Sequence, residues 1–206
     1  MDSCCKPVES PKAKAAKLVL WVALVINFGM FLVEGAFGFK AASTSLKADA
    51  SDFLGDSASY VITLLVFDKG AKPRWWAAFI KAALMFAIGL GVLGAAFYRA
   101  FYGIMPEAPT MGWVGLSAFL ANLIVAALLY RFRNHDINME SAWLCSFNDV
   151  VGNIAVVAAA GGVWFTVSRW PDLIVASIIS GLNLWGSFKV GRKLILERKL
   201  SLSVSQ

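Results

Sequence analysis

Three aspartates lie inside one long apolar segment of the chain, at Asp49, Asp52 and Asp56. Their spacing of three and then four residues places them on one face of a helix. A charged side chain at the centre of a bilayer costs about 2.5–3.5 kcal/mol on insertion scales, so acids in such segments are typical of functional sites. Three like charges on one face also repel one another unless some are protonated or a cation lies among them. The segment 44–67 therefore indicates a cation-binding helix face.

A second segment, residues 140–167, repeats this pattern. Cys145 and Asp149 are four residues apart, and Asn153 follows after four more, so all three share a helical face. If this face meets the aspartates of the first segment, three carboxylates and one thiolate converge. Zinc prefers four-coordinate sites built from such ligands, and a thiolate favours soft or borderline metals over magnesium and calcium. The predicted metal ligands are Asp52, Asp56, Cys145 and Asp149.

Other polar side chains could line the same path. Asn27 and Glu34 are seven residues apart and share a face of the first apolar segment, where they line the cavity or simply hydrogen-bond to a neighbouring helix. Each predicted ligand also has a structural alternative. The aspartate pair could hold helices together, and Cys145 could be a small buried hydrophobe. The candidate pathway-lining residues are Asn27, Glu34, Asp49, Asn148 and Asn153.

These residues require a membrane scaffold. Of the 206 residues, 59% are hydrophobic and 16% are charged, against about 25% charged in an ordinary soluble domain. Six apolar runs reach or approach the length of about 20 residues that spans a bilayer. We therefore predict an all-α, polytopic membrane protein with six transmembrane helices. The predicted spans are residues 18–39, 44–67, 75–98, 111–130, 140–167 and 172–190.

The basic residues are distributed as a topology signal. The net charge is +6. Fourteen Lys and Arg lie on one side of the predicted spans and four on the other, which places both termini in the cytosol. This distribution argues against nucleic-acid binding as the reason for the charge. We expect a flexible cytosolic tail over residues 1–16, a membrane domain over 17–194 and a short basic tail over 195–206.

The order of these segments resembles the cation diffusion facilitator family of zinc and heavy-metal efflux proteins. The resemblance covers residues 17–194. It rests on Asn27 and Glu34, on the stretch 48–56 with the sequence ADASDFLGD, and on the stretch 145–153. Residues 170–172, with the sequence WPD, also open the sixth span in the manner of the family. The family places two ligands four residues apart on the second helix and two on the fifth. The matching positions are Asp52, Asp56, Cys145 and Asp149.

The resemblance implies a transporter rather than an enzyme. Family members act as dimers in the membrane and exchange metal for protons by alternating access. The expected cargo is a divalent cation exported from the cytosol, with zinc the leading candidate and cadmium, cobalt or iron as alternatives, and no prosthetic group. The expected partners are protons, the lipid bilayer and a second copy of the chain. The expected location is the plasma membrane, as in the bacterial inner membrane.

Two departures from the family pattern affect these expectations. Many relatives have histidine where Cys145 stands, which leaves the identity of the metal open. Many also carry a cytosolic metal-binding domain after the sixth span, so we expect a short form here, with dimer contacts inside the membrane. A stripe of small residues in the third segment is a candidate contact, or packs against a neighbouring helix of the same chain. It consists of Ala87, Gly91 and Gly94.

Two other functions remain as alternatives. A membrane sensor or scaffold would bind metal without moving it. A phosphatidyl-alcohol transferase also carries intramembrane aspartates and binds a divalent metal. Its motif, however, needs an arginine between the acids, and residues 49–60 contain none.

Overall fold

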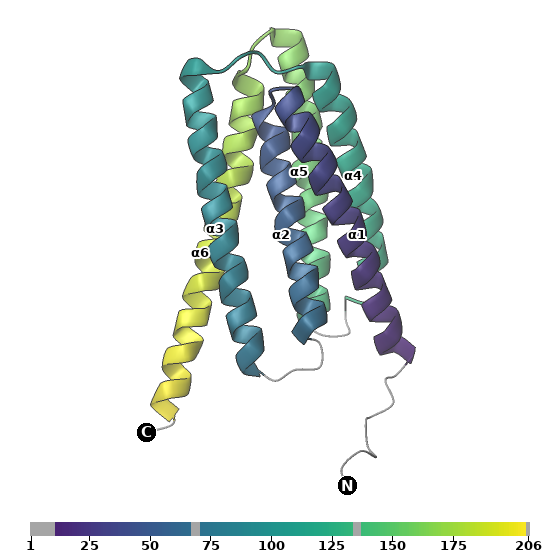
Figure 1. Ribbon diagram of the computed structural model, residues 1–206, viewed down its shortest axis with the longest axis vertical. Coiled ribbons are helices and arrows are strands. Elements are labelled where there is room, and N and C mark those ends of the chain that lie inside the picture. The colour runs from purple at the N-terminus through teal and green to yellow at the C-terminus, as the bar shows by residue number, and fades with distance from the viewer. Residues whose placement is uncertain (1–10, 67–70, 134–136, 205–206) are drawn as a thin grey trace.

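The computed structural model describes residues 11–66, 71–133 and 137–204, and within these ranges the protein is all-helical, without strands. The prediction of an all-α protein is therefore confirmed. Helices account for each predicted span, and their arrangement is shown in Figure 1. They are α1 (Pro11–Lys40), α2 (Thr44–Val66), α3 (Ala71–Tyr102), α4 (Ala108–Tyr130), α5 (Ile137–Thr166) and α6 (Trp170–Val204).

Four of the helices contain stretches long and apolar enough to cross a membrane, judged over the described residues. These stretches lie in α1, α3, α4 and α5. The remaining two helices, α2 and α6, are long enough to cross a membrane but not apolar enough to qualify by composition. The polar residues inside α2, with its three aspartates, lower its average hydropathy. The qualifying stretches are Lys14–Lys40, Ala82–Tyr102, Ala108–Tyr130 and Cys145–Thr166.

The first and last helices extend beyond the apolar runs. Helix α1 begins at Pro11, within the segment predicted as a tail, and α6 continues to Val204, through most of the predicted basic tail. Proline is well tolerated in the first turn of a helix, and lysine and arginine are good helix formers. The limits of an apolar run therefore predict where a membrane-spanning stretch begins and ends, but the helix itself can continue beyond them.

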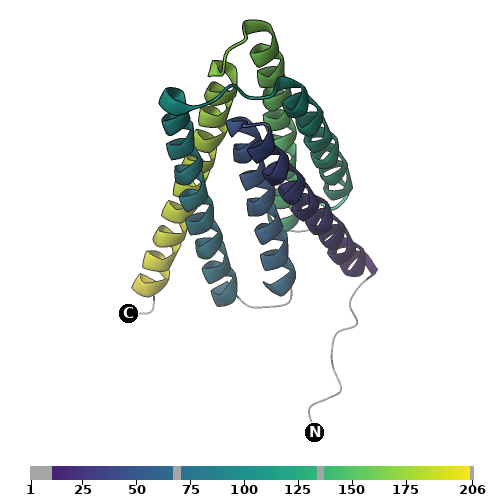
Figure 2. The same cartoon turned by 45° about the horizontal axis from the view of Figure 1, so that its top comes forward.

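Helix α2 lies at the centre of the bundle. The closest packing joins α1 with α2, α3 with α6, and α4 with α5, and α2 also packs against α3, α5 and α6. Helix α1 begins and α6 ends at the same end of the bundle (Figure 1). In the tilted view, α1 and α6 spread away from each other toward that end (Figure 2). The central position of α2 gives its polar face access to several other helices.

At the opposite end, the carboxylate of Asp172 joins α6 to the start of α2. It accepts hydrogen bonds from the backbone amides of Thr44 (2.7 Å) and Ser45 (2.9 Å). It also accepts bonds from the hydroxyls of Ser43 (2.7 Å) and Ser45 (2.6 Å). The first amides of a helix lack partners within the helix, so Asp172 caps α2 from another element. This group of bonds, the Asp172 clamp, fixes the height of α2 against α6.

Two arginines reinforce the same end. Arg99, near the end of α3, donates to the carbonyl of Ala42 and to the hydroxyl of Thr44. Arg169 donates to the carbonyls of Gly103 and Ala100, which lie at the end of α3. The Ala42 residue has a left-handed backbone with a φ of 50°, a conformation that non-glycine residues rarely adopt without support. The connection between α1 and α2 is therefore held by α3 and α6 together.

Candidate metal site

The three aspartates of α2 face the interior of the bundle. Asp49 and Asp56 are buried and Asp52 is half-buried. The side-chain amide of Asn183, on α6, donates a hydrogen bond to Oδ1 of Asp52. The hydroxyl of Tyr60, one turn further along α2, donates to Oδ2 of Asp56 at 3.3 Å. Two of the three aspartates are thus oriented by neutral hydrogen-bond donors.

Helix α5 brings its polar face against this row. The hydroxyls of Tyr60 and Ser146 lie 2.8 Å apart and join α2 to α5. This contact sets a register in which the carboxyl group of Asp149 lies within hydrogen-bonding reach of Asp56 and interacts with Asp52. The structure therefore places Asp149 beside Asp56, with Asp52 one helical turn further along α2.

Cys145 lies one turn from Asp149 on the same helix. Its thiol is half-buried and forms no disulfide. It is close enough to the Tyr60 hydroxyl to interact with it electrostatically. The predicted cysteine is therefore located at the α2–α5 contact, one helical turn from the carboxyl groups.

The four residues do not form a closed cage. Within the part of the chain that the structure describes, no three histidine, cysteine, aspartate or glutamate side chains converge closely enough to hold a metal ion. Two carboxylates point instead to the donors Asn183 and Tyr60.

A second pair of acids lies between α1 and α2. Glu34 and Asp49 are close enough to interact, and both are buried. Among the described residues, the hydrogen-bonding neighbour of Glu34 is Asp49 itself, and no other group donates to the Glu34 oxygens or to Oδ2 of Asp49. Asn27, on the same face of α1, donates to the carbonyl of Ala23 at 2.9 Å, while its own oxygen is unpartnered. Buried polar groups without protein partners are usually satisfied by water or by a ligand.

The candidate asparagines of α5 occupy different environments. Asn153 is buried, and both polar atoms of its side chain lack partners among the described residues. Asn148 is instead exposed, between the exposed side chains of Phe147 and Val151. The structure therefore places Asn153 inside the bundle, whereas the side chain of Asn148 is exposed.

Several polar residues at the site were not expected from the sequence. Tyr60 could have been noticed, because it follows Asp56 by four residues and so shares its helical face. Asn183 gives a weaker signal, as a single amide in the last apolar segment. Asn122, which is buried in α4 with an unpartnered oxygen, also interrupts an apolar run. Ser146 gave no signal, because small hydroxyl residues are common in membrane helices.

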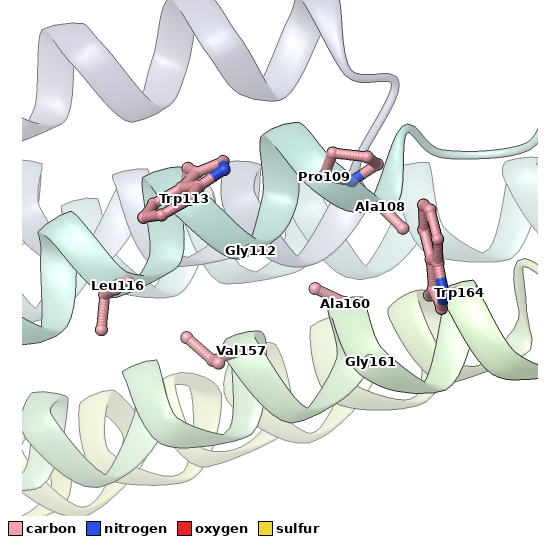
Figure 3. A pocket seen from close by; sticks show the side chains of 9 residues that line it. All are labelled: Ala108, Pro109, Gly112, Trp113, Leu116, Val157, Ala160, Gly161 and Trp164. Carbon is pink, nitrogen blue, oxygen red and sulfur yellow. The ribbon is translucent and has the colours of Figure 1, made fainter.

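A groove on the outside of α4 and α5 has a different character. Figure 3 shows Trp113 and Trp164 on either side of a floor made by Gly112, Ala160 and Gly161. No charged side chain lines it. Because a cation needs oxygen, nitrogen or sulfur ligands, this apolar groove is not a candidate cation site.

Comparisons with known proteins identify the class to which this scaffold belongs. Residues 20–202 match the family model described as the cation efflux transmembrane domain. The match covers most of the chain and includes every residue of the aspartate row and of its partners on α5 and α6. The chain therefore belongs to the cation efflux family, also called cation diffusion facilitators, and is a multi-pass membrane protein.

Among curated relatives, the metal cation efflux system protein CzcD of Cupriavidus metallidurans is 25% identical over 178 residues, which are 81% of this chain and 55% of the relative. The zinc transporter ZitB of Pectobacterium atrosepticum is 27% identical over 192 residues, covering 86% of this chain and 60% of the relative. An uncharacterized metal transporter of Schizosaccharomyces pombe is 22% identical over 228 residues, with 93% and 56% covered. The chain thus spans little more than half the length of these relatives.

These comparisons decide between the alternatives of enzyme and transporter. The cation efflux family and the named relatives are transporters and not enzymes. A phosphatidyl-alcohol transferase is therefore no longer an alternative for this chain.

Proposed function

We propose that this protein exports a divalent metal cation from the cytosol in exchange for protons. Asp52, Asp56, Cys145 and Asp149 are the proposed ligands, and zinc is the leading candidate for the cargo. The proposal rests above all on one observation: the contact between the hydroxyls of Tyr60 and Ser146, 2.8 Å apart, packs α2 against α5 so that Asp56 and Asp149 are neighbours in the interior of the bundle. The names of CzcD and ZitB, a metal cation efflux protein and a zinc transporter, support the same cargo class.

The chemistry of the donor set supports exchange for protons. Carboxylate and thiol groups bind metal in their deprotonated forms, so metal binding releases protons. When the site faces the other side of the membrane, protons compete for the same groups and release the metal. Three carboxyl groups and a thiol can carry both cargoes in turn, and no prosthetic group is needed for this exchange.

The proposed topology has six spans with both ends in the cytosol. The excess of Lys and Arg on one side of the spans supports this orientation. The start of α1 and the end of α6 lie at the same end of the bundle, as six spans require (Figure 1). Helices α2 and α6 then cross the membrane although they are less apolar, because their polar residues face the bundle interior. On this topology, the Asp172 clamp lies at the outer side of the membrane.

We further propose that the active form is a homodimer. The small-residue stripe of α3 is exposed, and nothing lies within 4 Å of the position that a side chain would occupy at Gly91 or Gly94. This favours a contact with another chain over packing of the stripe inside its own chain. Small residues let two helices approach closely in a membrane, so this face suits a second copy.

Transport by the purified chain in proteoliposomes tests the proposed function. Vesicles with an imposed pH gradient should accumulate zinc or cadmium only when the chain is present, and uptake should cease when the gradient is collapsed. Asp52→Asn and Asp149→Asn variants, which keep the side-chain size, should abolish uptake. Binding of metal without uptake in the wild type would instead support a sensor or scaffold.

A further inference from the structure

Asn183 is a polar side chain in α6, the helix outside the α2–α5 pair that carries the proposed ligands. Its amide donates a hydrogen bond to Oδ1 of Asp52, and the two residues are 131 positions apart in the sequence. Asn183 is half-buried, between the exposed Leu182 and the half-buried Leu184. The bond therefore connects one ligand of the cation site directly to a third helix.

The position of Asn183 is fixed by the scaffold and not only by its own bond. Asn183 follows Asp172 by eleven residues, about three helical turns, so both lie on the face of α6 that meets α2. The Asp172 clamp sets the height of the two helices at their outer end through four hydrogen bonds. Below it, Gly89 of α3 approaches Leu184 so closely that an added Cβ would lie 3.2 Å from its side chain. These contacts fix α6 against α2 and α3 on the two sides of Asn183 in the sequence.

We propose that Asn183 is a positioning residue of the cation site. This inference rests on the proposed function, because it assigns Asn183 a role toward the ligand Asp52. The amide occupies one carboxylate oxygen and leaves the other free for the ion. Partners of this kind orient metal ligands, and their loss usually costs 10–100-fold in metal affinity. Because α6 packs most closely with α3, the same bond also links the α3–α6 pair to the occupancy of the site.

The chemistry of the amide explains why this position suits asparagine. A lysine or arginine there would neutralise Asp52 and compete with the cargo for it. A carboxylic acid at this position could donate a hydrogen bond only while it is protonated, so its support of Asp52 would change with the pH. An amide donates a hydrogen bond without a net charge and does not titrate, so it orients the carboxylate and leaves its charge available to the ion.

Equilibrium binding to the purified full chain in detergent tests this role, with zinc and cadmium titrated by isothermal calorimetry at one pH. The Asn183→Leu variant keeps a similar volume but cannot donate, and it should bind both ions about 10–100-fold more weakly. The Asn183→Gln variant keeps the donor and should recover most of the affinity. Leu182→Ala, a change at the adjacent exposed residue, should bind as the wild type does. Gel filtration and thermal melting of each variant separate loss of binding from loss of the fold.

The outcomes distinguish this inference from the proposed function. If the wild type binds neither ion, the proposed function fails. If the wild type binds and Asn183→Leu binds equally well, the positioning role is wrong. If Asn183→Leu and Asn183→Gln weaken binding equally while both retain the fold, the shape of the Asn183 side chain matters and its hydrogen bond does not. The positioning role through that bond would then also be wrong. Should Asn183→Leu fail to fold, the comparison of Asn183→Ala with Asn183→Gln gives the same decision.

Discussion

The Asp172 clamp leads to a prediction about stability that follows directly from its geometry. Replacing Asp172 by asparagine keeps the size of the side chain but converts one acceptor oxygen into a donor. In the native clamp, Oδ1 accepts three bonds from Ser43 and Ser45, and Oδ2 accepts one from the amide of Thr44 at 2.7 Å. The best orientation of the new amide keeps the three bonds and places its NH2 group against the N–H of Thr44.

The expected cost can be estimated from these contacts. Hydrogen bonds to charged groups contribute about 1.5–3 kcal/mol each, and leaving a buried donor unsatisfied costs about 1–3 kcal/mol. Side-chain hydrogen bonds measured in a membrane protein average only about 0.6 kcal/mol, so each bond is expected to contribute toward the low end of the first range. One lost bond and three bonds weakened by loss of charge therefore predict destabilisation of about 2–3 kcal/mol. Asp172→Ala, which removes all four bonds, should destabilise the protein further.

Thermal unfolding of the purified protein in detergent measures this effect. Glu107→Gln is the matched control, because Glu107 is an exposed carboxylate at the same end of the bundle whose side chain makes no capping hydrogen bond. The melting temperature should fall clearly for Asp172→Asn and remain unchanged for Glu107→Gln. Equal melting temperatures for Asp172→Asn and the wild type would show that the clamp does not hold α2 to α6.

Three further predictions concern topology, assembly and selectivity. Reporter domains inserted between α2 and α3 and between α4 and α5 should both be cytosolic, and an external signal at either would overturn the six-span arrangement. Replacing Gly91 and Gly94 together by leucine should convert cross-linked dimers in native membranes into monomers, whereas unchanged cross-linking would remove α3 from the interface. Cys145→Ser should weaken binding of cadmium more than that of manganese, because the thiolate favours soft ions, and an unchanged preference would mean that the thiolate is not a ligand.

The elements of the fold were predictable from the sequence because long apolar runs have few alternatives to membrane helices. The pairing of α2 with α5 was also within reach, since acids and a cysteine at helical spacing are costly in a bilayer unless they meet. Asp52 and Asp56 are four residues apart, as are Cys145 and Asp149, so each pair could be assigned to one helix face from the sequence alone. Helix ends were less predictable, because charged residues continue a helix once it leaves the membrane, as at the end of α6.

The supporting contacts were not predictable in the same way. Asp172 and Asn183 act on residues 127 to 131 positions away, and no local pattern specifies which helix a single polar side chain will meet. The bond between Tyr60 and Ser146 depends on the register of two helices, which is a tertiary property. Asn148 is exposed although the neighbouring Asp149 is half-buried, because adjacent residues of a helix point about 100° apart, and its place on the pathway stays a prediction.

The central claim is that one thiolate and three carboxylates bind a single ion, and X-ray absorption at the zinc edge tests it directly. The sample is the zinc-loaded protein in a Cys4→Ser, Cys5→Ser background, so that Cys145 is the remaining cysteine. The spectrum should contain one sulfur at about 2.3 Å and oxygens at about 2.0–2.2 Å. The sulfur contribution should disappear in the additional Cys145→Ser variant. A zinc-loaded protein with oxygen ligands alone, or a spectrum that Cys145→Ser leaves unchanged, would contradict the proposed site.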